Sequence, residues 1–428
     1  MHVAALQGAP SPASCVCITY KMPLMNAPLT PLDHTVLPAG IRARMVPGIN
    51  GLTMHVLEAG FDATLPSRAS PAAGAPQRPC VLLLHGFPEL AYSWRKVMLP
   101  LAAAGYHVIA PDQRGYGRTV NSTAGWDGGY DGDLAWFRVL NLVRDALALV
   151  AACGYKQVAV VGHDFGSRVA AWCALTRPDV FRSVVLMSAP FEGAPLLPFN
   201  TVSGAVQPEP KAAAIARTLA DLARLPRPRK HYQWYYSTRE ANANMQRAPQ
   251  GVHDFLRAYY HHKSADWKQN QPYPLKEWSA AELAKLPTYY VMDQALGMAE
   301  TVAAEMPSPA EVAACAWLTE AELAVYSSEY ARNGFQGGLQ WYRCGTEPAQ
   351  SAALQLFAGR TIDVPSMFIA GKSDWGTHQN PGAFERMQGA ACAQMNACHL
   401  IDGAGHWVQQ EQPAAVSRLL LEFLRGQG

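Results

Sequence analysis

Asp164 is the residue of this chain with the clearest chemical context. It lies in the segment Gly162–Gly166, which has the sequence Gly-His-Asp-Phe-Gly. A β-branched run at 157–161 precedes this segment, and a run typical of a helix follows at 167–175. A strand, a sharp turn and a helix together form the context of a nucleophile elbow, in which the glycines let the backbone turn tightly. A carboxylate at this position would attack a carbon centre and form an alkyl ester.

Asp and Gly are also common in surface turns, so the hypothesis requires catalytic partners for Asp164. Asp374 lies in the segment 371–374, and His406 lies in the Gly-rich segment 403–407. Each follows its own strand-like run, and the chain order nucleophile, acid, histidine is that of hydrolases with this elbow. A loop Asp or His alone is often structural, but the three types in this order predict a catalytic triad.

A further segment, His85-Gly86-Phe87-Pro88, follows the apolar run 81–84. Its position and its glycine suit a loop whose backbone N–H groups form an oxyanion hole. We expect the two donors to be the N–H of Phe87 and the N–H of Phe165, the residue after the nucleophile. They would stabilise the tetrahedral centre that forms when water attacks an ester of Asp164.

The elements that must position these residues alternate between strands and helices. The runs 41–46 and 52–58, joined by a turn at 48–51, predict an antiparallel hairpin. The later strands are near-continuous apolar runs, which indicates a parallel sheet covered on both faces. These strands are expected at 81–84, 107–110, 157–161, 183–187, 365–370 and 399–401, and helices at 140–153, 167–175 and 414–424.

The β/α pattern stops after residue 190 and resumes near residue 358. The intervening segment is rich in aromatic residues and Pro, and runs such as 212–225 and 320–330 have a helical period. An inserted, mainly helical cap over the carboxyl edge of the sheet explains this break, because ligands bind at that edge. The predicted division is therefore an N-terminal extension at 1–40, a first core part at 41–190, a cap at 191–357 and a second core part at 358–428.

The N-terminal extension and the loop 65–79 are rich in Pro and Ala. We expect residues 1–40 to be a flexible arm, or in part an incorrectly assigned start, with Met22 or Met25 as alternative starts. The segment has no basic region followed by a compact apolar core, so it does not resemble a secretory signal.

Composition excludes several function classes. With 35 basic and 33 acidic residues the net charge is +2, and the sequence contains neither a basic stripe nor an acidic tail, so nothing indicates nucleic acid. An apolar run of 18 residues is absent, so no membrane span is expected. Nine irregularly spaced cysteines favour a reducing compartment, the cytoplasm. The pair His261-His262 lacks further ligands at suitable spacing, so we interpret it as structural and expect no metal.

Several motifs together resemble the epoxide hydrolases of the α/β-hydrolase fold. They are the segments 85–89, 92–95, 112–118, 162–166 and 405–407. The resemblance covers about residues 41–190 and 360–425. It implies a mostly parallel eight-stranded sheet flanked by helices, with an inserted cap. It also implies catalysis without a cofactor.

The resemblance continues in two islands of the cap, 232–235 and 334–343. Each resembles a place where that family has a cap tyrosine, so it assigns this role to Tyr232 and Tyr342. The first match is weaker, and Tyr235 or Tyr236 could take the place of Tyr232. Phenolic O–H groups directed at the epoxide oxygen would polarise the C–O bond and protonate the alkoxide.

The same resemblance implies a substrate pocket lined by aromatic and loop residues. The expected substrate-binding residues are His85, Pro88, Trp94, Tyr235, Trp341 and Trp407. The chain departs from the family pattern at Phe165, where many relatives have Trp, and in its long cap. Extra segments at 253–267 and 279–293 reshape the pocket, so substrate preference cannot be carried over.

The resulting hypothesis is an epoxide hydrolase that acts on a hydrophobic epoxide with water as co-substrate, as a monomer or homodimer. A haloalkane or haloacid dehalogenase has the same Asp-His-Asp triad but binds halide with N–H donors. Phe165 and the cap tyrosines argue against this alternative. A non-catalytic ligand-binding protein of the same fold is the alternative from another class. Loss of a triad residue would indicate it, and all three are present.

Overall fold

The computed structural model describes residues 29–61, 78–122, 128–197 and 211–426. Met22, Met25 and most of the loop predicted at 65–79 lie outside these residues. Residues 29–40 differ from the predicted flexible arm, because they lie against the core. They contain η1 (His34–Val36), Leu37 is buried, and the backbone N–H of Leu32 donates to His55 Nε2 at 3.2 Å.

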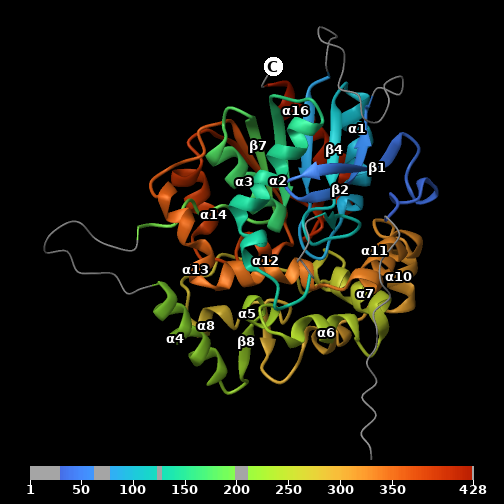
Figure 1. The fold of residues 1–428 in the computed structure, drawn as a ribbon. Helices are drawn as coiled ribbons and strands as arrows, with labels where there is room; N and C mark the ends of the chain where they lie inside the picture. The colour runs from blue at the N-terminus through green and yellow to red at the C-terminus, as the bar shows by residue number, and fades with distance from the viewer. Residues whose placement is uncertain (1–28, 62–77, 123–127, 198–210, 427–428) are drawn as a thin grey trace, which may run out of the picture.

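A single large sheet forms the centre of the molecule (Figure 1). Its eight-strand path has the order β1-β2-β4-β3-β6-β7-β10-β11, and the short β5 (Val120–Asn121) pairs with β2 beside it. The pairs of β2 with β1, β4 and β5 are antiparallel, and the remaining pairs are parallel. The strands are β1 (Ile41–Ile49), β2 (Leu52–Ala59), β3 (Cys80–Leu84), β4 (His107–Pro111), β6 (Val158–His163), β7 (Phe181–Met187), β10 (Ser366–Gly371) and β11 (Met395–Ile401).

Two strand boundaries differ from the sequence prediction for local reasons. β1 continues to Ile49 rather than ending at residue 46, because its ladder with β2 resumes after an irregularity between Val46 and Ile49. The turn is therefore the pair Asn50-Gly51, whose φ angles of 48° and 83° are those that tight hairpin turns require. β11 starts at Met395 rather than 399, since Met395, Ala397 and Cys398 also pair with β10.

Helices flank the sheet because its central strands are apolar on both faces. β3 and β10 are buried at every position. α1 packs against α16, and α2 packs against α3. The helices and turns of this part are η2 (Ala91–Trp94), α1 (Arg95–Ala103), η3 (Leu134–Phe137), α2 (Val139–Ala152), α3 (Phe165–Thr176), η5 (Trp375–Thr377), α14 (Ala383–Arg386), η6 (Met387–Ala391), α15 (Val408–Glu411) and α16 (Pro413–Arg425).

The segment between β7 and β10 forms a layer of helices across one end of the sheet, drawn in yellow-green to orange in Figure 1. Ser308 with Glu311 and Thr319 with Glu322 form capping boxes that start α10 and α11. The helices are α4 (Lys211–Ala223), α5 (Tyr232–Tyr236), α6 (Glu240–Gln246), α7 (Gly251–Lys263), α8 (Ala280–Leu283), α9 (Met298–Ala303), α10 (Pro309–Ala314), α11 (Glu320–Asn333), α12 (Gln336–Thr346), α13 (Pro348–Ser351) and η4 (Ala352–Phe357).

This layer also contains a two-stranded antiparallel sheet that the sequence did not predict. β8 (Arg229–His231) pairs with β9 (Val291–Asp293) and leads directly into α5, which carries Tyr232. A continuous cluster of buried apolar side chains runs from the central sheet into this layer. Among the described residues, no helix is long and apolar enough to cross a membrane.

Candidate active site

Asp164 lies at the junction of β6 and α3, as the sequence predicted. β6 ends at His163 and α3 begins at Phe165, and Asp164 has φ 53° and ψ −120°. The turn requires both flanking glycines, since a Cβ on Gly162 would lie 2.0 Å from the carbonyl oxygen of Gly166. A Cβ on Gly166 would in turn lie 2.2 Å from the carbonyl oxygen of Leu84. The strained backbone of Asp164 thus presents a side chain at the carboxyl end of the sheet.

The structure brings the three expected triad residues together in one buried cluster. His406 Nε2 lies 3.3 Å from Asp164 Oδ2, and His406 Nδ1 lies 3.0 Å from Asp374 Oδ1. Asp374 Oδ1 also accepts a hydrogen bond from the N–H of Gly376 at 2.7 Å. Asp374 is acceptor-only when ionised, so Nδ1 of His406 donates to it, and Nε2 is the ring nitrogen that faces Asp164.

The surroundings keep both carboxylates ionised. Burial alone would raise the pKa of Asp164, but the proximity and charge of His406, with the charge of Lys263, hold it well below its usual range. Burial also opposes ionisation of Asp374, but His406 and the N–H of Gly376 lower the pKa of that carboxyl. Asp164 is therefore available as a nucleophile at neutral pH.

The predicted oxyanion loop contacts the nucleophile directly. The N–H of Phe87 donates to Asp164 Oδ1 at 3.0 Å, and a Cβ on Gly86 would lie 2.4 Å from Asp164 Cβ. Phe165 is the first residue of α3, so its N–H is one of the helix-terminal donors without a partner in the helix. Because Phe87 holds Oδ1, Oδ2 is the oxygen left to react.

His85 has a different position from the expected substrate contact. Its Nδ1 lies 2.9 Å from the carbonyl oxygen of Gly86, and its Nε2 accepts from the N–H of Gln113 at 3.0 Å. Both ring nitrogens are therefore used by the backbone, and the side chain is fully buried. The ring nitrogens of His85 therefore bind the backbone of the oxyanion loop and of Gln113, and a contact of His85 with substrate stays a prediction.

Glu89 and His163 are functional candidates that the sequence interpretation missed, although both lie in its motifs. Glu89 Oε2 lies 2.5 Å from His163 Nδ1 and accepts from the N–H of Gly86 at 3.0 Å. His163 Nε2 lies 2.7 Å from the carbonyl oxygen of His406. Both nitrogens of His163 thus face acceptors, so the ring is an imidazolium paired with the carboxylate of Glu89. This pair connects the oxyanion loop to the residue expected to act as base.

The loop that carries His406 is also bound to the end of α7. The N–H of His406 donates to the carbonyl oxygen of Lys263 at 2.9 Å, and Trp407 Nε1 donates to the carbonyl oxygen of Tyr260 at 2.8 Å. Glu411 accepts from the N–H groups of Ala265, Gly405 and Trp407 at 2.8 to 2.9 Å.

The two expected cap tyrosines lie side by side above the elbow. The rings of Tyr232 and Tyr342 are 5.8 Å apart, and Tyr342 packs edge-on against Phe165 at 4.7 Å and Phe87 at 5.5 Å. Burial raises the pKa of each phenol well above its usual value, and the charge of Asp164 adds to this effect. Both phenols are therefore neutral proton donors at neutral pH.

The structure distinguishes among the three candidates for the first tyrosine. Tyr232 donates to Gln379 Oε1 at 3.2 Å and is affected by the charge of Asp164. Tyr236 uses its hydroxyl as a donor to that of Tyr259 at 3.2 Å. The ammonium of Lys230 lies over the ring of Tyr235, with Nζ 4.4 Å from the ring centroid. Burial and the glutamates of the cap raise the pKa of Tyr235. Tyr232 is thus the best placed of the three, and Tyr235 lies in a different environment from the expected substrate contact.

The other expected lining residues, Pro88, Trp94, Trp341 and Trp407, are all buried. Trp341 packs edge-on against Phe165 at 5.6 Å, and Trp407 packs against His406 at 4.7 Å. The carbonyl oxygen of Pro88 accepts from Tyr260 at 2.9 Å. Trp94 is fully buried at the end of η2, and its indole N–H has no hydrogen-bond partner among the described residues.

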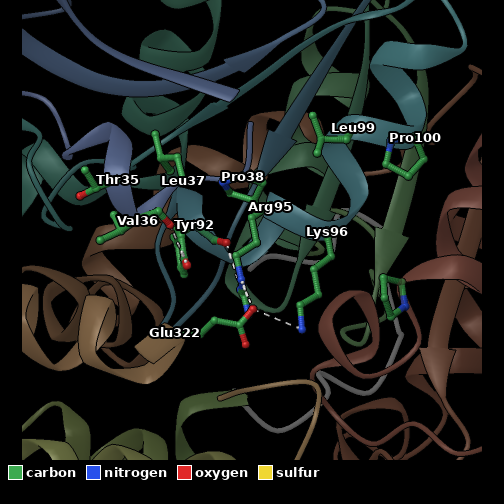
Figure 2. Close-up of a pocket in the computed structure, with 11 residues that line it drawn as sticks. Thr35, Val36, Leu37, Pro38, Tyr92, Arg95, Lys96, Leu99, Pro100 and Glu322 are labelled. Atoms are coloured by element: carbon green, nitrogen blue, oxygen red, sulfur yellow. Dashed lines mark hydrogen bonds and ion pairs between the residues drawn. The ribbon is translucent and has the colours of Figure 1, made fainter. Parts of the chain in front are cut away.

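A hollow with a volume of about 530 Å³ lies away from the triad, where α1 meets η1 and α11 (Figure 2). Arg95 and Lys96 both face Glu322 there, at 2.8 and 3.3 Å. A smaller cavity of about 20 Å³ lies behind Phe165, next to Trp341. Neither hollow is lined by a triad residue.

His262, one of the two adjacent histidines interpreted as structural, lies in an aromatic environment. His262 is fully buried between the rings of Trp267 and Tyr289, at 4.5 and 4.7 Å. Within the part of the chain that the structure describes, no cluster of three or more His, Cys, Asp or Glu side chains could hold a metal ion.

Comparison with known proteins gives the class of this fold and site. Residues 79–413 match the family model of the alpha/beta hydrolase fold. Epoxide hydrolase A of Mycobacterium tuberculosis is 34% identical over 363 residues, which is 83% of this chain and 92% of that protein. An epoxide hydrolase of Caballeronia sordidicola is 28% identical over 88% of this chain and 92% of that protein.

Solved structures agree with the sequence comparison. An epoxide hydrolase from an endophytic Streptomyces matches with a TM-score of 0.67 at 32% identity, covering 91% of this chain and 96% of that one. Potato (Solanum tuberosum) epoxide hydrolase I matches with a TM-score of 0.65 at 26% identity, covering 90% and 99%. The chain belongs to the epoxide hydrolases of the α/β-hydrolase fold.

Proposed function

We propose that this chain hydrolyses an epoxide to a vicinal diol through a covalent ester on Asp164. In the first step Asp164 Oδ2 attacks a ring carbon, a new C–O bond forms and the bond from that carbon to the ring oxygen breaks. Oδ1 becomes the ester carbonyl oxygen, because it already accepts from the N–H of Phe87 at 3.0 Å. The reaction is nucleophilic catalysis by a carboxylate.

Tyr232 and Tyr342 supply the proton for the ring oxygen in this step. A free alkoxide is a poor leaving group in an apolar site, and a phenol that donates to it lowers the barrier. The ring oxygen becomes the first hydroxyl of the diol when one phenol gives up its proton. The pair of buried, neutral phenols above Asp164 supports this assignment.

His406 and Asp374 act in the second step. Nε2 of His406 removes a proton from water, and the resulting hydroxide adds to the ester carbon. The N–H groups of Phe87 and Phe165 stabilise the oxyanion. The bond between the ester carbon and Oδ2 then breaks, and Oδ2 takes the proton from His406 and leaves as the second hydroxyl of the diol. The carboxylic acid left on residue 164, which now contains the oxygen of the water, returns its proton to the phenolate. No group outside the chain and water is needed for this sequence of steps.

The observation that carries the proposal is the position of Oδ2 of Asp164, 3.3 Å from His406 Nε2 and opposite the oxygen held by Phe87. The same carboxylate can thus be attacked by water that His406 activates.

We also propose the division into core at 41–190 and 358–428 and cap at 191–357. We expect a hydrophobic epoxide as substrate and a monomer or homodimer. The free thiols of the seven described cysteines support a cytoplasmic location.

The test is the intact mass of the His406→Gln chain after exposure to a panel of epoxides and haloalkanes. Without the base, the ester on Asp164 should accumulate. A mass gain equal to a whole epoxide is expected, and the adduct should map to the peptide that contains Asp164. A gain equal to a haloalkane less its hydrogen halide would indicate a dehalogenase, and an unchanged mass with every compound would contradict the proposal.

A further inference from the structure

Lys263 is the last residue of α7 and lies at the boundary between the cap and the triad. The residue is 3% exposed. Its carbonyl oxygen accepts from the N–H of His406 at 2.9 Å, so the backbone that carries the ammonium is bonded to the base residue. With the residues that the structure describes, Lys263 Nζ forms neither a hydrogen bond nor an ion pair.

Four aromatic rings surround this ammonium instead. Nζ lies 4.9 Å from the ring centroid of Tyr290, 5.5 Å from Tyr259, 5.6 Å from Trp407 and 5.7 Å from Tyr289. The faces of such rings carry partial negative charge and attract a cation within about 6 Å. The surroundings are therefore those of an aromatic cage for a positive charge. Burial lowers the pKa of Lys263, and the charges of Asp164, Asp374 and Glu89 oppose this effect.

We propose that Lys263 is a positioning residue that keeps His406 in its proton-accepting form during hydrolysis of the ester. The inference rests on the proposed role of His406 in that step. When Asp164 is esterified, it loses its negative charge. Asp374 remains 3.0 Å from His406 Nδ1 and favours an imidazolium, which cannot remove a proton from water. A positive charge nearby opposes this protonation.

Lys263 is better suited to this role than the other buried cation of the centre. The charge of His163 is compensated by Glu89 at 2.5 Å, whereas the charge of Lys263 is surrounded by rings. A charge without a bound counter-ion acts over a longer distance in a buried site. The ionisable groups that face His406 and Lys263 from the neighbouring elements are Asp164, Asp374, Glu89, His163, Glu411, His262, Tyr259, Tyr289 and Tyr290.

The experiment separates ester formation from ester hydrolysis in the full-length chain. Quenched-flow mass spectrometry gives the rates at which the ester on Asp164 forms and decays, from pH 5 to pH 9. In Lys263→Met, the acidic limb of the decay rate should move up by about one pH unit, or about tenfold in rate on that limb. The rate of ester formation should change little, because Asp164 stays ionised throughout this range. Lys263→Arg keeps the charge and should restore the wild-type limb.

Lys230→Met is the matched control, because Lys230 is also a cap lysine over a tyrosine ring, with Nζ 4.4 Å from the centroid of Tyr235. The charged groups that influence it are Glu240 and Glu300 rather than the triad, so this variant should keep the wild-type profile. Ester formation with an unchanged acidic limb in Lys263→Met would overturn the role of Lys263 alone. The role of Lys263 would also be overturned if Lys263→Arg shifted the acidic limb of the decay rate as much as Lys263→Met does. Failure of His406→Gln to accumulate any ester would instead overturn the proposed function.

Discussion

Glu89 and His163 form a fully buried ion pair, with Glu89 Oε2 2.5 Å from His163 Nδ1. Neither residue touches the nucleophile by a described hydrogen bond. Glu89 instead accepts from the oxyanion loop at Gly86, and His163 donates to the carbonyl oxygen of His406. The pair therefore fixes two catalytic loops relative to each other, and its charges matter for both geometry and stability.

Glu89→Gln should destabilise the chain by about 3–5 kcal/mol, because removing one partner leaves a buried charge uncompensated. Denaturant unfolding of the variant and the wild type at pH 6 measures this difference. Glu422→Gln is a suitable control, since it breaks a surface pair with Arg418 and should cost at most about 1 kcal/mol. Equal losses in the two variants would show that Glu89 contributes no more than a surface charge.

The contribution of this pair should also depend on pH in two directions. Burial opposes both charges, but His163 lowers the pKa of Glu89 below its usual 4.5, and Glu89 raises that of His163 above its usual 6.5. The stabilisation by this ion pair is thus complete between pH 4.5 and pH 6.5, the usual pKa values of the two side chains. It is lost as the pH falls through the lowered pKa of Glu89 or rises through the raised pKa of His163. The difference in unfolding free energy between wild type and Glu89→Gln should be largest from pH 4.5 to 6.5 and should narrow toward both pH 3 and pH 9. A constant difference over this range would contradict this account.

Asp164→Ala should reduce turnover of any epoxide substrate by at least about 10⁴-fold, since loss of a nucleophile removes the covalent route. Circular dichroism should show an unchanged fold. Asp179→Ala, which removes a surface carboxylate paired with Arg177, should retain wild-type turnover. A folded Asp164→Ala chain that keeps near wild-type activity would exclude the ester mechanism.

Tyr232→Phe and Tyr342→Phe should each slow ester formation by about 10²-fold or more, because each loses a proton donor at the ring oxygen. Quenched-flow measurement of the ester gives this rate directly. Tyr235→Phe changes a hydroxyl in the cap region around Lys230 and should leave the rate within a few-fold of wild type. A larger defect in Tyr235→Phe than in Tyr232→Phe would reverse the assignment of the first tyrosine.

Gly86→Ala should abolish most activity although it adds a single methyl group. That methyl would lie 2.4 Å from Asp164 Cβ and 2.5 Å from Asp164 Oδ1, so either the nucleophile or the Phe87 donor must move. Gly389→Ala has no neighbour within 4 Å of its added methyl and should be fully active. Steady-state kinetics of both variants test the prediction. An active Gly86→Ala chain would show that the oxyanion loop can move enough to make room for the methyl group.

The order and spacing of residues were enough to predict a triad, because Asp164, Asp374 and His406 each follow a strand-like run. Parallel strands bring their carboxyl ends to one edge, so the side chains meet without further information. The main strands and helices of the core follow from apolar periodicity for the same reason. The roles of the individual site residues stay predictions until they are tested.

The other features of the site and of the cap could not be predicted, because they depend on contacts that the periodicity of the sequence does not encode. Glu89 and His163 lie 74 residues apart, and His163 and His406 lie 243 residues apart. The signal available was a Glu and a His inside motifs that end buried strands, where charged side chains need partners. Lys263 gave no such signal, since its cage combines residues from the cap and from the loop of Trp407. The strands β8 and β9 are three residues each, too short for an alternating pattern.

The attachment of the His406 loop to α7 has a consequence for how the molecule becomes active. The base belongs to the second part of the core, but its N–H and its neighbours are held by Lys263, Tyr260 and Ala265 from the inserted segment. A chain whose inserted segment has not yet docked would have a nucleophile without a correctly oriented base. Such a chain could be alkylated at Asp164 but could not regenerate. In chimeras that take the inserted segment from a relative, turnover should therefore be preserved only when the end of α7 and the loop of His406 come from the same protein.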